Sequence, residues 1–250
     1  MRAKYLIVLA AVLLAGLLCA DYTQAQLSTG VVIWRHDTNL EVDNAADFDG
    51  SSRTADEKIK EWDAQGSGMG LSMTYDLPAI LSIFGEVGIS QMTVRDEDVV
   101  DPNRDVNTLG MDDALYLAVG MRPNGSFPNN DNLFWSVGLT FSMITSDLDE
   151  DINVTWEYKE QTLAVDGQIG YMLRGLGIYG GLRFANYSGT LDETDTSNPV
   201  GQQVRSTEFD RDGKIDVMVG AMTSGGPVVG LVELGFIGAF TARTGISYKF

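Results

Sequence analysis

Cysteine and histidine are almost absent from this chain of 250 residues. Its one cysteine is Cys19 and its one histidine is His36. No disulfide framework can form from a single cysteine, and zinc sites built from several Cys or His ligands are excluded. A Ser-His-acid site would have to use His36, which stands beside Asp37. We therefore expect no enzyme, and keep a hydrolase that uses His36 as a minor alternative.

Basic residues are scarce as well, with 17 Lys and Arg against 35 Asp and Glu, a formal net charge of −18. This balance argues against nucleic acid as a partner and against binding to anionic lipid by bulk attraction. The acids are concentrated: 25 of them, with only six bases, fall in four segments, 39–66, 96–113, 147–151 and 191–213. We expect a solvated, repulsive surface there. No cofactor is expected beyond divalent cations that bridge such carboxylates non-specifically.

Only one long apolar run is present, between Tyr5 and Ala20. Arg2 and Lys4 precede it, and small residues near Ala25 offer a cleavage position, which together predict a secretory signal peptide over residues 1–25. The run is short for a spanning helix and no stop-transfer flank follows.

Lipidation of Cys19 is the other possibility at this end of the chain. A lipoprotein signal carries Gly, Ala or Ser before its cysteine, whereas Leu18 stands there. We therefore favour cleavage, with a single domain over residues 26–250.

The remaining sequence alternates apolar with small or polar residues, the period of a β-strand. Residues 67–77 show this most clearly, with Met69, Leu71, Met73 and Tyr75 on one face. Ten segments follow the pattern: about 27–38, 67–77, 80–95, 112–122, 133–146, 153–173, 176–190, 213–223, 228–237 and 239–250. The first is ambiguous, because apolar residues occupy both of its faces. The stretch 123–132, rich in Pro, Asn and Gly, predicts a turn region.

The segment 153–173 changes parity. Trp156 and Tyr158 fall on the opposite face from Leu163 and Val165. This predicts either a bulge near 159–161 or a strand that projects above a bilayer.

The last segment ends on an aromatic residue in register with its apolar face, which includes Ile246, Tyr248 and Phe250. It resembles the C-terminal insertion signal of bacterial outer-membrane β-barrels. The resemblance implies a small barrel of the porin-like superfamily, located in the outer membrane and monomeric. It implies the barrel-assembly machinery, outer-membrane lipid and lipopolysaccharide as partners, with these three residues as the assembly signal.

The expected fold class is therefore all-β: a transmembrane antiparallel up-and-down barrel with ten strands, or eight if one segment is misread. A soluble β-sandwich is the competing interpretation. An even strand number places both termini in the periplasm and the long connections, 39–66, 96–111, 147–152 and 191–213, outside the cell. Six aromatic residues near strand ends suit the interfacial girdles of such barrels: Trp34, Tyr75, Trp135, Trp156, Tyr171 and Tyr248.

Counted from the periplasmic strand ends, seven ionisable residues fall at similar depth on the inward face. They are Arg35, Glu86, Asp166, Arg183, Asp216, Glu233 and Arg243. Charges in so narrow an interior must pair. They predict a salt-bridge layer that closes the lumen and a structural or surface-interaction role. A narrow cation-preferring channel is the alternative.

One acidic fragment resembles the front of an EF-hand loop, with Glu208, Asp210 and Asp212 at alternate positions before Gly213. Its twelfth position is Val219 rather than a bidentate Glu, so the calcium cage is incomplete. These residues are a weak candidate for a metal site, and no other is present.

Overall fold

The computed structural model describes residues 26–43, 60–77, 81–96, 108–151, 154–196, 204–211, 215–223 and 226–250. The signal peptide predicted for 1–25 and the question of Cys19 lie outside them. The strands are β1 (Gln26–Asp43), β2 (Lys60–Leu77), β3 (Leu81–Asp96), β4 (Thr108–Phe127), β5 (Asn130–Asp151), β6 (Val154–Leu173), β7 (Leu176–Asp195), β8 (Val204–Arg211), β9 (Ile215–Thr223), β10 (Val228–Ile237) and β11 (Ala239–Lys249). Among these residues no helix is long and apolar enough to cross a membrane.

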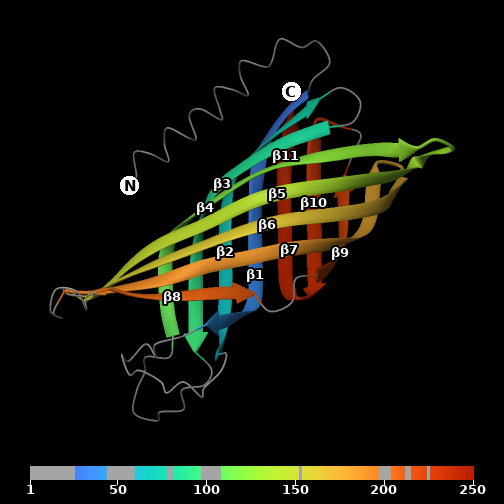
Figure 1. Ribbon diagram of the computed structural model, residues 1–250. Coiled ribbons are helices and arrows are strands. Elements are labelled where there is room, and N and C mark those ends of the chain that lie inside the picture. Colours follow the sequence, from blue (N-terminus) through green and yellow to red (C-terminus); the bar gives the residue numbers. More distant parts are fainter. Residues whose placement is uncertain are drawn as a thin grey trace.

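Ten of the strands, β1–β7 and β9–β11, form a closed antiparallel barrel (Figure 1). The ring closes where β1 pairs with β11, from Ser28 opposite Lys249 to Thr38 opposite Ala239. This confirms the predicted ten-stranded barrel. We call the end that holds Gln26 and Phe250 the ten-strand end.

β8 lies within the segment 191–213, for which a loop was predicted. It pairs with β7 between Ser188 and Thr194, and with β1 between Leu40 and Asp43. Figure 1 shows it along the edge of β7, reaching the arrowhead of β1. The hairpin β10–β11 fills the gap between β9 and β1 only below this point. The far end of the barrel is therefore closed by eight strands, β1–β8, and we call it the eight-strand end.

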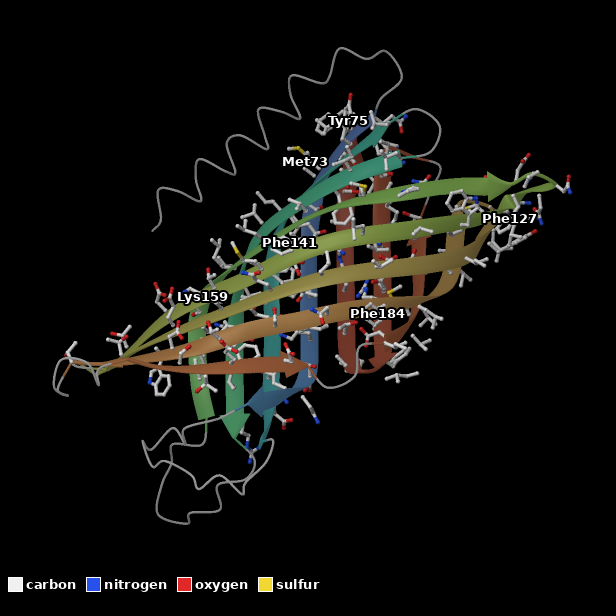
Figure 2. All side chains as sticks on the ribbon, in the orientation of Figure 1. Met73, Tyr75, Phe127, Phe141, Lys159 and Phe184 are labelled. Carbon is white, nitrogen blue, oxygen red and sulfur yellow. The ribbon has the colours of Figure 1, made fainter. Side chains whose placement is uncertain are left out.

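The outer face carries an apolar girdle. Leu71, Leu163 and Phe184 are among its members and are 64%, 52% and 52% exposed; Phe141 and Phe184 can be followed in Figure 2. On β6 the girdle runs from Leu163 to Leu173, about 34 Å of strand, or about 26 Å of height at a tilt of about 40°. Towards the eight-strand end the outward residues of β6 become polar.

The strands run further than the sequence suggested. The predicted turn region 123–132 is largely strand, with β4 ending at Phe127 and β5 starting at Asn130. Segments assigned to the loops 39–66, 96–111 and 147–152 also contain strand ends, because β1, β2, β4 and β5 continue past the girdle. Backbone pairing above the girdle needs no apolar outward face, so the alternation that marks a membrane strand fades there.

The bulge predicted near 159–161 is wrong. β6 pairs without interruption with β7 from Val154 to Leu173, so its alternation is continuous. Trp156 and Tyr158 share the inward parity of Asp166 and are 6% and 0% exposed. The strand projects beyond the girdle, and large apolar residues fill its inner side.

Two of the aromatic residues expected in the girdle also lie inside. Trp34 faces inward against Tyr116, with ring centroids 4.4 Å apart, and Trp156 is buried. Tyr171 and Tyr248 do face outward, with exposed fractions of 41% and 49%. β1 was ambiguous because both faces are apolar, and the inward face proves to be the one with Val32 and Trp34.

Candidate functional site

Six charged side chains from six strands meet inside the ten-strand part of the barrel. We call them the charge layer: Glu86 (β3), Arg122 (β4), Asp166 (β6), Arg183 (β7), Glu233 (β10) and Arg243 (β11). Alternation positions them, because each has the parity opposite to the girdle residues of its strand. Three acids and three arginines balance in charge.

Glu233 is the acceptor of two bonds. Arg183 Nη2 donates to its Oε1 at 2.9 Å and Tyr179 Oη donates to its Oε2 at 2.9 Å. Glu233 is 6% exposed. A buried carboxylate with a charged and a neutral donor is satisfied on both oxygens, so this pair fixes β7 against β10 through the lumen.

Arg122 and Asp166 form a second pair. Arg122 Nη2 lies 3.3 Å from both oxygens of Asp166. The carboxylate leans over Gly138 of β5, where a Cβ atom would overlap it. Because Gly138 has no side chain, the Asp166 carboxylate can lie over β5 and reach Arg122 on β4.

The third pair joins Arg243 to Glu86, across the inner faces of β1 and β2. Asp216 lies beside the layer, opposite Arg183 in the register of β7 and β9, and is 0% exposed. Its Oδ1 accepts from the backbone N–H of Ala239 at 3.1 Å. Asp216 thus holds the tip of the β10–β11 hairpin at the point where the wall divides.

The structure places six of the seven predicted layer residues inside the barrel. Arg35 is the exception and corrects the prediction: it has the parity of Val31 and Ile33, and its side chain is exposed on the outer face. Arg122 was missed, although Met121, an outward residue at 47% exposure, marks its neighbour as inward.

A second closure lies at the eight-strand end, where apolar side chains fill the interior. We call it the apolar core. Every strand of the eight-strand ring contributes: Leu40, Ala64, Met92, Val94, Met111, Ala114, Ile144, Trp156, Tyr158, Leu191 and Phe209. Tyr158 and Phe209 stack with centroids 5.3 Å apart. An eight-stranded barrel has an interior just wide enough for side chains to fill, and this ring matches that expectation.

One carboxylate lies in the zone between the two closures. Glu160 is 6% exposed, and Tyr158 Oη donates to its Oε2 at 2.5 Å. Trp34 and Tyr116 cover the same zone from β1 and β4. A water-filled path from end to end would have to cross the charge layer and then the apolar core.

The other candidate residues are not brought together. His36 faces inward beside Gly66, whereas Asp37 follows it on the same strand and points to the opposite face, so they form no dyad. Glu208 and Asp210 lie on β8, in extended backbone rather than an EF-hand loop, and Asp212 lies outside the described residues. No cluster of three or more metal-ligating side chains occurs in the part of the chain that the structure describes.

Ile246 and Phe250, two of the proposed assembly residues, face outward with exposed fractions of 59% and 74%. The ring of Phe250 contacts that of Tyr248, and its N–H donates to the carbonyl of Leu27 at 2.9 Å. The outward apolar face is thus continuous to Phe250, and a role in assembly stays a prediction.

No protein-family model and no curated protein sequence matches the chain. Solved structures of bacterial barrels do. Outer membrane protein OprG of Pseudomonas aeruginosa aligns over 90% of this chain and 96% of its own, at 13% identity and a TM-score of 0.47. The translocator domain of the autotransporter NalP of Neisseria meningitidis aligns over 100% of this chain and 97% of its own, at 13% identity and a TM-score of 0.43. The outer membrane protease OmpT of Escherichia coli aligns over 90% of this chain and 97% of its own, at 12% identity and a TM-score of 0.44. At these identities the similarities concern the fold alone.

Proposed function

We propose that this protein is a bacterial outer-membrane barrel with a closed lumen, and that it works through its outer surface rather than as an open channel. The girdle supports the membrane placement, because its height of about 26 Å matches the apolar band of such barrels. Lipopolysaccharide and lipid are the proposed surroundings, with the acidic eight-strand end outside the cell.

The apolar core carries the proposal of closure. A pore that conducts ions keeps a polar, wet lumen, whereas Tyr158, Leu191 and Phe209 seal this one as the core of a soluble protein would. The charge layer is a second barrier, in which each arginine is engaged by a carboxylate. We assign the barrel a structural or surface-interaction role.

Thiol labelling tests the closure. In a Cys19→Ser background, Ala164→Cys places one thiol on the inward face between the two closures, where Ala164 is 6% exposed. Asp147→Cys is the matched control, on the exposed outer face near the end of β5. We expect a membrane-impermeant maleimide to modify the control in intact cells or vesicles and to leave Ala164→Cys unmodified. Equal labelling of both would overturn the closed lumen.

A narrow cation-preferring channel is the second candidate, and one observation favours it. Asp216 and Glu160 add two buried acids to the charge layer, whose own three acids and three arginines balance. If the core opened, the excess carboxylate would favour cations over anions.

A further inference from the structure

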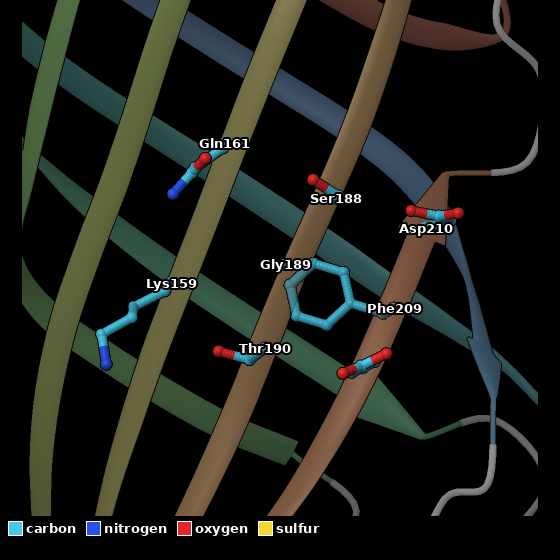
Figure 3. Close-up of a pocket in the computed structure, with 8 residues that line it drawn as sticks. Lys159, Gln161, Ser188, Gly189, Thr190, Phe209 and Asp210 are labelled. Carbon is cyan, nitrogen blue, oxygen red and sulfur yellow. The ribbon is translucent and has the colours of Figure 1, made fainter.

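A pocket lies on the outer face of β6, β7 and β8, away from the lumen. It has a volume of about 430 Å³ and is drawn in Figure 3. The register makes it a grid of two rows across three strands: Lys159, Thr190 and Glu208 in one, Gln161, Ser188 and Asp210 in the other. All six side chains have the outward parity. Gly189 and Phe209, which have the inward parity, also line the pocket, and its three strands are held by continuous pairing.

The grid is polarised. Its one cation stands on β6 and its two carboxylates stand on β8, two strand spacings or about 9.5 Å away. Between them β7 offers only the hydroxyls of Ser188 and Thr190. A ligand with an anionic and a cationic end, joined by a polar middle, would complement this order of charges.

The carboxylates are the open part of the grid. Lys159 Nζ already lies 2.7 Å from Glu157 Oε2 and 3.9 Å from Asp192 Oδ2 in the next row. Glu208 and Asp210 are exposed, and no described side chain of a base pairs with them. They attract a cation, and their alternate positions on one strand, about 7 Å apart, suit an organic ammonium with several donors better than one metal ion.

The position of the pocket relative to the girdle indicates which kind of molecule could supply such a ligand. The next row towards the girdle holds Leu163 and Asn186, and the row after it Val165 and Phe184. Leu163 and Phe184 are girdle residues. A molecule with its polar group in the pocket would lay apolar chains directly on them. The pocket thus stands at the level of lipid headgroups, if the membrane placement proposed above holds.

We propose that this pocket binds the phosphoethanolamine group of an outer-leaflet lipid. The primary ammonium donates to Glu208 and Asp210, the hydroxyls of Ser188 and Thr190 hold the middle, and the phosphate accepts from Lys159. Charge-assisted N–H donation to carboxylate is the strongest of these bonds. A quaternary ammonium has no N–H to donate, so choline lipids bind less well.

Native mass spectrometry of the full chain tests this, with phosphatidylethanolamine and phosphatidylcholine of identical acyl chains offered together. We expect the ethanolamine lipid to be retained about tenfold better, and Glu208→Gln/Asp210→Asn to abolish the preference. As a control, Asp131→Asn removes an exposed carboxylate near the start of β5, at the end of the barrel away from the pocket, and should leave the preference intact. Equal retention of both lipids by the unmodified chain would overturn the proposal, as would a preference that survives the double substitution.

A second comparison separates the two sources of the group. Lipid A with and without a phosphoethanolamine substituent is offered in the same way, and retention of the substituted form alone assigns the site to glycolipid as well as phospholipid. Retention of neither lipid A form assigns it to phospholipid. A chain that fails to insert into bilayers contradicts the proposed function, whereas an inserted chain without the amine preference contradicts only this inference.

Discussion

Gly138 shows how one residue without a side chain supports the charge layer. The Asp166 carboxylate occupies the space where its Cβ would stand, and from there it reaches Arg122. The inward glycine is therefore a positioning residue for the ion pair.

Gly138→Ala should lower the free energy of unfolding by about 1–3 kcal/mol, because the added methyl displaces Asp166 from Arg122. Gly167 is the matched control. It neighbours Asp166 in sequence but faces outward, with nothing within 4 Å of an added Cβ. Gly167→Ala should leave stability unchanged or raise it by about 0.5 kcal/mol. Urea unfolding in lipid vesicles measures both, and equal effects would refute the role of Gly138.

The alternation of each strand determined whether its charged residue could be predicted to face inward. Glu86, Asp166, Arg183, Glu233 and Arg243 belong to strands whose apolar face is unambiguous, so their inward direction could be predicted. Arg35 could not be placed, because β1 is apolar on both faces and depth alone does not give direction. Arg122 lay at the expected end of β4, where the continuation of the strand to Phe127 gives no apolar signal.

At the level of elements, β5 carries the clearest test of register. Leu139 is 40% exposed on the girdle and Thr140 faces the lumen. Leu139→Arg should destabilise the barrel by about 2–4 kcal/mol, since it places a charge against lipid. Thr140→Arg should cost less, because the lumen is polar at that level. Refolding into vesicles under urea compares them, and the reverse order would mean a register shifted by one residue.

β8 could not have been predicted by the same pattern. Its outward residues Ser206, Glu208 and Asp210 are polar, because the strand lies beyond the girdle. Its inward residues Thr207 and Phe209 are too few to show a period. The strand is specified instead by pairing with β7 and β1 and by the core that Phe209 joins.

Phe209→Ala should therefore cost about 3–5 kcal/mol, because it leaves a cavity beside Tyr158 and weakens β8, which joins β7 to β1 in the eight-strand ring. Phe209→Leu keeps most of the volume and should cost less. Hydrogen exchange would show the loss concentrated in β8 and in the adjoining parts of β7 and β1. A uniform loss over all strands would contradict a local role for this ring.

At the scale of the whole molecule, the barrel has two sections with different numbers of strands. Ten strands surround the charge layer and eight surround the apolar core. The ten-stranded fold followed from alternation, because the strands of the ten-strand part carry an apolar outward face along the girdle. The eight-strand section could not be predicted from the same alternation, because its apolar side chains face inward, as in the core of a soluble protein.

The closed lumen is the central claim, and single-channel conductance of the refolded full chain in planar bilayers tests it most directly. We predict no resolved open-state current for the unmodified protein. Tyr158→Ala/Arg183→Ala, which weakens both closures and leaves the acids of the charge layer in excess, should show discrete openings that favour cations. A large, stable conductance of the unmodified protein would contradict the closed lumen, and anion selectivity would contradict the excess of acid inside it.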